Sequence, residues 1–503
     1  MTQQFLNELI AFMQQKGFVW GPEPEIYGGS AGFYSFAPLG KLLKNNVENT
    51  IRRVFSNNDF YEVEFPIIMP KQVWEASGHL SGFTDSMIEC KKCKSSFKVE
   101  QILEELFPNK KITDFKKFLT ENKVECPGCK AFLGSDIKDY DLMMKTTVGM
   151  GTVAYNRPET ATTTYLQFLR YYDFFRKKLP FGLFQIGNAF RNEISPRQHL
   201  LRTREFTQAE AQMFIFKHQK QDFAPFKKIQ AKKIPLLPWK DHEKNKKHSM
   251  VSLKDAINKK LLKNQAYAYF LNLTYDMFLE LEIPKDKIRI VQHSPAEKAF
   301  YAEDAWDIEI QLESFGWIEI CGVHDRTDYD LTQHAKYSKT NMEVLDEDGN
   351  KQIPHVLEIA FGTGRLVFSL LDIYYKKRKE DEGKSILTLP VSMAPIKIAV
   401  FPLLRKPPLI KIAKKVYDEL SEDWMCKYDE TASIGKRYLR AAEEGTPYAI
   451  TIDFDSLEKK DVTIRDRDTE KQVRIPLKHL KTVVDSLILQ DVKFKDIAKK
   501  TFK

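Results

Sequence analysis

The segment Leu183–Phe216 restricts the fold of this chain more than any other, because it reads as two β-strands joined by a loop that contains Ser195 and Pro196. Side chains of a strand alternate between its two faces. On the first strand we expect one side to be shared by Gln185, Arg191 and Glu193. The mostly apolar face of the second strand carries Thr207, Ala209, Ala211, Met213 and Ile215. Its opposite face carries Phe206, Gln208, Glu210, Gln212 and Phe214.

The polar side of this hairpin has an unusual concentration of charge, contributed by Arg191, Glu193, Arg202, Arg204 and Glu210. Charges on a buried strand must be paired or neutralised. One interpretation is a solvated outer face balanced by salt bridges. The other is a binding site in which arginines grip a polyanion and carboxylates hold a cation or an amine.

Length and composition indicate what kind of protein contains this hairpin. A chain of 503 residues exceeds one hydrophobic core, so we expect two or three domains. Its 43% hydrophobic and 29% charged residues are typical of a soluble globular protein. We expect a cytoplasmic protein, because no secretory signal is evident and no apolar run approaches the roughly 20 residues of a membrane span. The net charge of +9 weakly favours a polyanionic partner.

The region before residue 85 has helical apolar spacing over residues 40–55, followed by a short strand over residues 61–70 that closes on Pro70. Taken alone, this region is better explained as an ordinary helix and strand.

Four cysteines form a metal-binding pattern, with Cys90 and Cys93 in one CxxC turn and Cys126 and Cys129 in a second. Two such turns complete a tetrahedral thiolate site for Zn²⁺ and leave no open position, so the metal is expected to be structural. A disulfide framework is disfavoured in a cytosolic chain. We expect the charged segment Lys94–Glu125 between the turns to be helical.

Residues 217–263 contain 14 lysines against 4 acids. The segment is interpreted as a solvated, partly mobile insertion, or as a surface for nucleic acid phosphates.

Three further carboxylates accompany the hairpin. Glu159 follows Pro158 at the entry to an aromatic-rich helix, where it is either ordinary helix N-terminal chemistry or a second acid of the same pocket. Glu319 lies on a strand running into a glycine and is interpreted as a Mg²⁺ ligand or as a hydrated surface group. Glu358 lies on an apolar strand that reaches a Gly362–Gly364 turn, after which Arg365 enters a helix whose N-terminus favours phosphate.

After Pro390 the pattern changes to interleaved strands and helices, which predicts an α/β domain of about 110 residues with its own core. From its residues alone, this domain could equally serve an unrelated accessory or dimerisation role. Its Lys436 and Arg437 are candidates for RNA phosphate contact, or members of a solvated helix face.

Three stretches together, FRNE (190–193), REFTQAE (204–210) and GTGR (362–365), resemble motifs 2 and 3 of the class II aminoacyl-tRNA synthetases. The helix and strand ending at Pro70 resemble motif 1, which forms the dimer interface in that family. The finer pattern resembles the homodimeric glycyl-tRNA synthetase family over nearly the whole chain. It is carried by GFYSFAPLG, WEASGHLSGFTD, RPETA, FYAEDAWDIEI, GVHDRTDYDLTQHAKYS and GTPYAITIDF.

This resemblance implies an α+β catalytic core, an antiparallel sheet with flanking helices, over residues 1–390. Residues 85–140 would form a zinc-binding knuckle inserted into it, and residues 215–285 a lysine-rich helical insertion. Residues 391–503 would form an α/β anticodon-binding domain. The implied ligands and partners are ATP, Mg²⁺, structural Zn²⁺, glycine, its tRNA and a second copy of the chain.

The resemblance also implies the site. The catalytic residues would be Arg191, holding the α-phosphate, and Arg365, holding the γ-phosphate. Besides these two arginines, ATP would be bound by Asn192, Glu193 (at the adenine amino group), Leu201, Arg202, Thr203, Arg204, Glu205, Phe206, Glu319, Ile320, Gly362, Thr363 and Gly364. Glycine would be bound by His79, Glu159, Phe206, Glu210, Glu358, Ile359 and Ala360.

Three positions depart from the family pattern: Ala360 replaces a usual serine, Gln212 an acid that is often present, and Thr162 a glutamine. No ATP-gripping arginine is lost, so we expect activity to persist and glycine affinity to be the property affected.

Two other functions were weighed. A related synthetase for serine, threonine or proline is disfavoured by the three glutamates and by GVHDRTDYDL. A non-catalytic paralogue that binds nucleic acid or protein is disfavoured because Arg191 and Arg365 are both present.

Overall fold

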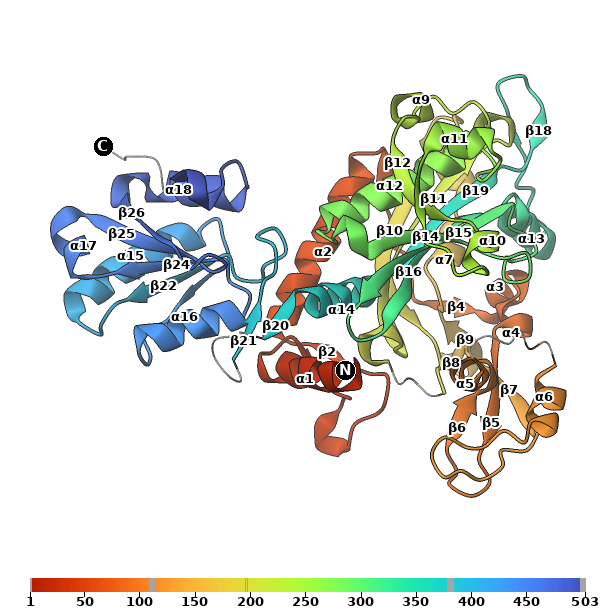
Figure 1. Ribbon diagram of the computed structural model, residues 1–503. Helices are drawn as coiled ribbons and strands as arrows, with labels where there is room; N and C mark the ends of the chain where they lie inside the picture. The colour runs from red at the N-terminus through yellow and green to blue at the C-terminus, as the bar shows by residue number, and fades with distance from the viewer. Residues whose placement is uncertain are drawn as a thin grey trace.

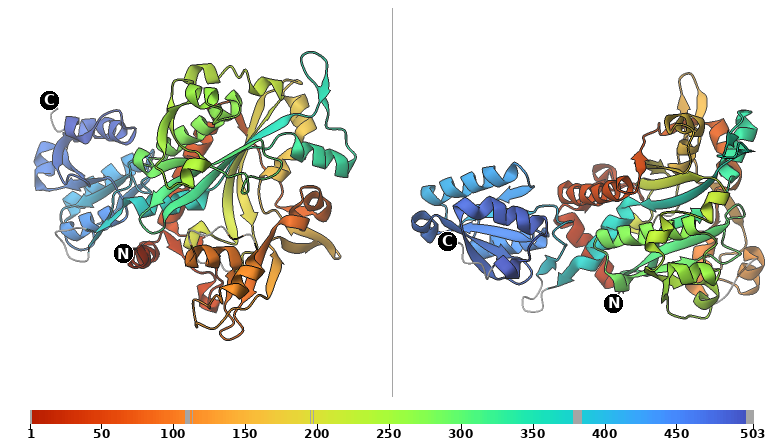
Figure 2. Two further views of the ribbon diagram at one scale, coloured as in Figure 1. Left: turned by 45° about the vertical axis from the view of Figure 1, so that its right-hand side comes forward. Right: turned by 90° about the horizontal axis from the view of Figure 1, so that it is seen from above.

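The computed structural model describes residues 2–107, 112, 114–194, 196, 198–377 and 384–497. A large N-terminal part is built on a nine-stranded sheet, and a smaller C-terminal part on a five-stranded sheet (Figure 1). The two parts lie side by side in all three ribbon views (Figure 2). Among the described residues, no helix has the length and apolar character needed to cross a membrane.

The central strands of the large sheet run antiparallel, and a parallel pair lies toward each edge. In spatial order the strands are β13 (Ser249–Ser252), β12 (Lys233–Leu237), β14 (Ile288–Gln292), β15 (Asp304–Leu312), β16 (Gly316–Asp325), β19 (His355–Gly362), β11 (Glu205–Ile215), β10 (Phe181–Phe190) and β3 (Phe60–Glu62). This arrangement agrees with the expected antiparallel sheet flanked by helices.

The predicted hairpin is formed by β10 and β11, which pair antiparallel from Phe181↔Phe214 to Phe190↔Glu205. The first strand of the hairpin is shorter than predicted. The first strand ends at Phe190, so Arg191 and Glu193 lie in the connecting loop and do not share the strand face of Gln185. The loop instead curls back, and the Arg191 N–H donates to the Arg204 carbonyl at 2.9 Å.

The apolar face of β11 packs on three helices, as its alternation predicts. Ala209, Ala211, Met213 and Ile215 belong to the main core. The covering helices are α2 (Pro38–Ser56), α12 (Gln265–Glu280) and α14 (Thr363–Tyr374), and α2 contacts both α12 and α14. The helix predicted over residues 40–55 is α2, which begins at a proline in its first turn.

The prediction of a single strand over residues 61–70 is wrong. The structure has two short strands, β3 and β4 (Ile68–Pro70), which join different sheets. β3 pairs with β10, and β4 pairs with β9 (Thr152–Asn156). Pro66 lies between them and has no N–H to donate, which interrupts the ladder.

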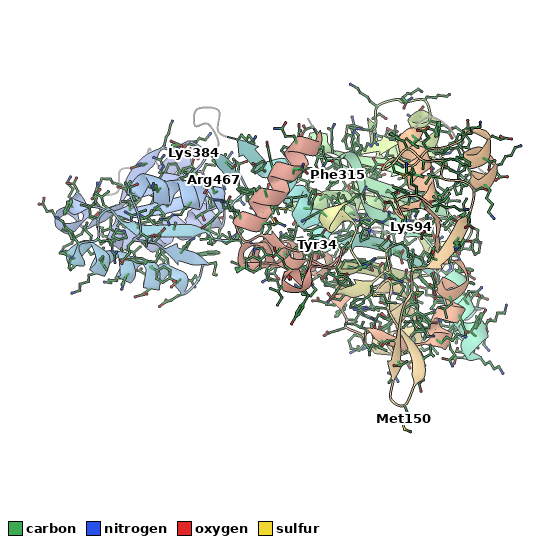
Figure 3. The ribbon with its side chains drawn as sticks, turned by 90° about the horizontal axis from the view of Figure 1, so that it is seen from below. Tyr34, Lys94, Met150, Phe315, Lys384 and Arg467 are labelled. Carbon is green, nitrogen blue, oxygen red and sulfur yellow. The ribbon has the colours of Figure 1, made fainter. Side chains whose placement is uncertain are left out.

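A hairpin and a separate small unit project from the large part. β8 (Met144–Val148) and β9 form the hairpin, with exposed Met150 at its tip (Figure 3). The small unit has its own core, which includes Ile88, Phe97 and Leu119. Its elements are β5 (Thr84–Glu89), β6 (Ser96–Lys98), α5 (Val99–Leu106), α6 (Phe115–Glu121) and β7 (Ile137–Asp141). The expected helical segment between the cysteine turns thus contains two short helices, while residues 108–111 and 113 lie outside the described residues.

The lysine-rich segment is built into the large sheet, because β12 and β13 form one edge of it. Short helices α9 (Phe226–Ile229), α10 (Trp239–His242) and α11 (Leu253–Asn258) surround these strands. Helix α12 follows and buries Phe270, Leu271 and Met277 in the main core.

The C-terminal part is the predicted α/β domain with a separate core. Its strands, in spatial order, are β23 (Cys426–Tyr428), β22 (Ile398–Pro402), β24 (Tyr448–Ile452), β25 (Asp461–Asp466) and β26 (Gln472–Pro476). Its helices are α15 (Pro407–Ser421), α16 (Ile434–Glu443), α17 (Phe454–Lys459), α18 (Leu477–Ile488) and α19 (Phe494–Ile497). Strand β23 was not predicted.

The prediction that Arg437 contacts RNA phosphates is wrong. Arg437 is buried, and its guanidinium donates to the carbonyls of Pro402, Leu403 and Asp429. It therefore ties α16 to the strand ends. Lys436, its neighbour, is exposed.

Candidate active site

A cavity of about 560 Å³ opens on the face of the large sheet opposite α2, α12 and α14. Its floor comes from β11, β15, β16 and β19, and its rim from the β10–β11 loop, the start of α14, β2 (Ser35–Phe36) and the chain before β15. Strand alternation determines which side chains reach it. On β19, Glu358, Ala360 and Gly362 line the cavity, whereas Leu357 and Ile359 belong to the core behind, and Phe361 contributes to both.

Arg191 lies between two aromatic rings at one end of the cavity. Its guanidinium is 5.3 Å from the Phe83 ring centroid and 5.4 Å from that of Phe206. Its Nε donates to the Pro158 carbonyl at 3.1 Å. Stacking and this hydrogen bond orient the charge, and its other N–H groups make no hydrogen bond to the described residues, so they can meet an anionic ligand.

Glu193 and Arg202 face each other across the β10–β11 loop, with Nε and Oε2 2.9 Å apart. Behind them, buried Asp85 of β5 lies 3.9 Å from Arg202 and 2.6 Å from the Lys98 ammonium. The Asn192 N–H donates to the Leu142 carbonyl at 2.8 Å. The cysteine-bearing unit therefore supports the loop that carries these charges.

Arg365 enters the cavity from the first turn of α14. It donates from Nε to the Leu201 carbonyl and from Nη1 to the Glu319 carbonyl, each at 3.0 Å. The Glu319 carboxylate lies 3.9 Å from the same Nη1. Two backbone contacts hold the guanidinium while leaving the exposed Glu319 carboxylate free to turn into the cavity.

Glu159, Glu210 and Glu358 line the other end of the cavity, and each accepts a hydrogen bond from a different hydroxyl. Thr162 donates to Glu159 and Thr160 to Glu210, each at 2.6 Å, and Tyr165 donates to Glu358 at 2.8 Å. Three carboxylates held this way form a site for a small cation or an ammonium group.

The three carboxyl groups have unequal proton affinities. Burial raises the pKa of Glu210 to about 8, and the charges of Glu358 and Glu159 add to that rise. Burial also acts on Glu358, but Arg326 and His324 outweigh it and lower its pKa. Burial is likewise outweighed at Glu159, whose pKa is lowered chiefly by His79. Glu210 is therefore the member that keeps a proton at neutral pH.

Arg326 organises this end of the cavity and was not singled out from the sequence. It forms a two-point contact with Asp330, at 2.7 and 2.8 Å, and reaches Glu358 at 3.2 Å. Its guanidinium also lies 4.9 Å from the Tyr301 ring centroid. The spacing of Arg326 and Asp330, four residues apart in DRTDYD, is the only local signal that pointed to such a pair.

Arg157 of the RPETA stretch is structural. It is buried, and it donates from Nη1 to the Gln185 side chain at 2.6 Å and from Nε to the Asn188 carbonyl at 2.8 Å. A Cβ at Gly187 would lie 2.2 Å from Arg157 Nη2, so a glycine is required there.

The structure shows what surrounds the three positions that depart from the family pattern. Ala360 presents a methyl group to the cavity, between Glu210 and Gly322 on the neighbouring strands. Gln212 is fully buried, and its side-chain amide has no hydrogen-bond partner among the described residues. Thr162 donates its hydroxyl to Glu159 at 2.6 Å.

Most predicted site residues line the cavity, and five do not. Ile359 lies on the core face of β19, which strand alternation requires once Glu358 and Ala360 face the cavity. Arg204 donates to the carbonyls of Glu193 and Ala31, and Thr363 donates to Glu48. Asn192 and His79 do not line the cavity, although His79 Nε2 lies 3.5 Å from Glu159 Oε2. The predicted lining residues are Glu159, Arg191, Glu193, Leu201, Arg202, Thr203, Glu205, Phe206, Glu210, Glu319, Ile320, Glu358, Ala360, Gly362, Gly364 and Arg365.

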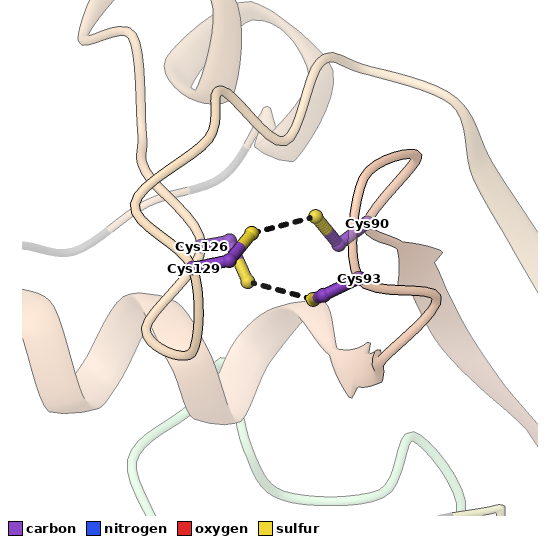
Figure 4. Close-up of side chains that lie close together, drawn as sticks. All are labelled: Cys90, Cys93, Cys126 and Cys129. Carbon is purple, nitrogen blue, oxygen red and sulfur yellow. Dashed lines mark hydrogen bonds between the residues drawn. The ribbon is translucent and has the colours of Figure 1, made fainter.

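The four predicted metal ligands converge (Figure 4). Cys90 Sγ lies 3.5 Å from Cys129 Sγ, and Cys93 Sγ lies 3.6 Å from Cys126 Sγ. Four sulfurs at this separation fit the ligand sphere of a tetrahedral Zn²⁺ ion.

The C-terminal domain matches the family model described as an anticodon binding domain over residues 397–487.

The whole chain resembles solved prolyl-tRNA synthetases. One from Giardia lamblia, in complex with prolyl-adenylate, aligns with a TM-score of 0.61 and 15% identity over 95% of this chain and 75% of that one. One from Cryptosporidium parvum aligns with the same TM-score and identity over 97% of this chain and 78% of that one. Together with the antiparallel sheet, this likeness defines a class II aminoacyl-tRNA synthetase fold.

The glycine–tRNA ligase of Methanococcus maripaludis is 35% identical over 94% of this chain and 97% of its own length. That of Pyrococcus horikoshii is 36% identical over 96% and 98%. The chain belongs to the glycine–tRNA ligase family.

Proposed function

We propose that the cavity activates glycine with ATP and that the product, glycyl-adenylate, passes its acyl group to the 3′ end of a glycine tRNA. The observation that carries this proposal is the placement of three buried glutamates at one end of a cavity whose other end holds Arg191, Arg202 and Arg365. One end suits an ammonium group and the other a triphosphate.

In the proposed reaction, a carboxylate oxygen of glycine attacks the α-phosphorus of ATP, and the bond to pyrophosphate breaks. Arg191 holds the α-phosphate and Arg365 the γ-phosphate, so negative charge is neutralised where it develops. Glu193 would accept from the adenine amino group. Mg²⁺, when bound through Glu319, supplies further neutralisation of the phosphates. No covalent nucleophile is needed, because positioning and charge neutralisation carry the step.

Specificity for glycine would come from the crowded floor of the ammonium site. Glu159, Glu210 and Glu358 hold the ammonium, while Ala360 and Gly322 leave room for an α-carbon without a side chain. Excluding a larger residue by contact is easier than rejecting a smaller one.

The C-terminal domain would bind the tRNA anticodon, which its family match supports. We place its boundary at residue 391, with residues 1–390 as the catalytic domain, 85–140 as a zinc-binding knuckle and 215–285 as the lysine-rich insertion. Zn²⁺ held by the four cysteines would be structural, since no ligand position remains open. We further propose a cytoplasmic homodimer, which the resemblance of α2 and of the strand that ends at Pro70 to motif 1 supports.

The decisive experiment is amino-acid-dependent ATP–pyrophosphate exchange, with each standard amino acid supplied separately. Exchange with glycine alone is expected. Exchange with another amino acid would overturn the assignment of the ammonium site. A folded, zinc-loaded protein without exchange would instead be a non-catalytic paralogue.

A further inference from the structure

His293 and His324 line the same cavity, Asp307 lies against His293, and the proposed reaction gives none of the three a contact with a substrate. They come from three neighbouring strands. The His293 N–H, just after β14, donates to the Ala305 carbonyl at 3.1 Å, while Ala305 pairs with His324 and Asp307 with Gly322. Paired positions in an antiparallel sheet project their side chains to one face. All three side chains therefore project from the face that the cavity occupies.

One donor atom from each of the three side chains lies within 4.8 Å of the others. His293 Nε2 is 2.6 Å from Asp307 Oδ2, and the two imidazole centroids are 5.7 Å apart. A Cβ at Gly322 would lie 2.7 Å from His324 Cε1, so only a glycine lets that ring lie across the strand. An ion bound by all three would replace the proton between His293 Nε2 and Asp307 Oδ2, widen their 2.6 Å contact and draw His324 inward.

Each imidazole can offer one ring nitrogen to an ion at this position, if the proton lies on its other nitrogen. Glu358 Oε1 lies 3.4 Å from His324 Nδ1, and a proton on that nitrogen leaves Nε2 as an acceptor. Carboxylate contacts of this kind orient metal-binding histidines. For His293 the ligand atom would be Nε2, which faces Asp307, with the ring proton on Nδ1, which is buried and has no partner among the described residues.

The donor set determines which ion would fit. Two imidazoles and one carboxylate suit Zn²⁺, Mn²⁺ or Fe²⁺, whereas Mg²⁺ and Ca²⁺ prefer oxygen ligands alone. The side chains are 22% (His293), 17% (Asp307) and 27% (His324) exposed, so the group is reachable from the cavity. Three protein ligands also leave a position open for an outside ligand.

We propose that His293, Asp307 and His324 bind a divalent transition-metal ion whose open coordination position faces the cavity. This site is separate from the four cysteines. Its outside ligand would be water, or a phosphate oxygen of the nucleotide. The identity of that ligand rests on the proposed function, but binding of the metal does not.

A second cluster of similar composition, Glu303, Asp325 and His355, provides a matched control. The buried Lys220 ammonium already lies 2.6 Å from Glu303 and 2.8 Å from Asp325. Because a cation of the chain itself fills that cluster, no metal ion is expected there.

The test measures metal content in the absence of ATP and glycine. Full-length protein is dialysed against micromolar Zn²⁺ and analysed by inductively coupled plasma mass spectrometry. Wild-type protein should hold about two zinc ions per chain, one in each site. The double variant His293→Gln/His324→Gln should hold about one, and His355→Gln about two. About one ion in the wild type, or about two in the double variant, would overturn the proposal.

Cobalt substitution gives a second readout that does not depend on the variants folding. Protein loaded with Co²⁺ should show thiolate-to-cobalt charge-transfer bands from the cysteine site together with weaker visible bands from a nitrogen and oxygen site. Only the thiolate bands in fully loaded wild-type protein would contradict the proposal. Because glycine-dependent exchange is measured separately with Mg²⁺, failure of the metal site and failure of the proposed function are distinguishable.

Discussion

Glu210 differs from Glu159 and Glu358 because, among the described residues, it forms no ion pair and accepts its hydrogen bond from the neutral hydroxyl of Thr160. Below pH 8 it keeps its proton in the free protein, and an incoming ammonium group favours its carboxylate form. Glycine binding should therefore release a proton. We expect the glycine dissociation constant to fall by up to about tenfold per pH unit as the pH rises from about 6 to about 8. Calorimetry in buffers of different ionisation enthalpy measures this release.

The same carboxyl group affects stability. Its pKa is higher in the folded than in the unfolded chain, so the folded state holds an extra proton between the ordinary value of 4.5 and about 8. Stability contributed by this group therefore falls as pH rises through that window. Glu210→Gln should raise the melting temperature at pH 8 and abolish the pH dependence of glycine binding. Glu419→Gln, at an exposed position of α15, should change neither.

Arg365 is held by two backbone carbonyls and not by the core, so its removal should spare the fold. Arg365→Ala should lower kcat/KM for ATP–pyrophosphate exchange by roughly 100- to 1,000-fold, the loss typical of a donor that stabilises charge in a transition state. Arg53→Ala, an exposed arginine of α2, is the matched control. Near-normal exchange in Arg365→Ala would remove this residue from the proposed mechanism.

At the scale of elements, the cysteine-bearing unit should depend on its metal, because its core is small. Cys126→Ser should lose zinc and increase hydrogen exchange in β5, α5 and α6, while β10 and β11 remain protected. The KM for ATP should rise, since Asp85 supports Arg202. Cys426→Ser, in the C-terminal core, should keep its zinc. Equal loss of protection in β11 would show that the unit does not unfold separately.

Lys220 joins a short helical turn after β11 to β16 through its ion pairs with Asp325 and Glu303. Lys220→Met would leave the fully buried Asp325 without its cation, which typically costs about 3–5 kcal/mol. Urea unfolding of the catalytic part should show this loss. The double variant Lys220→Met/Asp325→Asn should recover part of it, and no recovery would argue against the ion pair as the cause.

At the scale of the whole molecule, two cores are joined by a short connection and by contacts such as the Lys16–Glu443 ion pair. Chemistry and anticodon binding should therefore be separable. Arg437→Ala, which frees three carbonyls in the C-terminal domain, should lower the rate of tRNA aminoacylation and leave glycine-dependent exchange within about twofold. An equal loss in both assays would show that the two cores are energetically coupled.

The amino-acid sequence alone was enough to predict most elements and much of the site. The alternation in β11 and the apolar spacing of α2 are local patterns: the first predicts which β11 side chains enter the main core, and the second agrees with the buried face of α2. The paired CxxC turns likewise predicted a group that converges. Such features depend on residues near one another in the chain, where the backbone geometry is already known.

Only the tertiary structure decided which side chains meet from distant parts of the chain. Arg326 reaches Glu358, Asp85 supports Arg202, and His293 lies beside Asp307 because strands and loops far apart in sequence pack together. The same packing turned Arg437 inward and placed Ile359 behind the site. Local patterns reveal which face a residue takes, whereas burial, charge pairing and proton affinity are properties of neighbours that the chain acquires only when it folds.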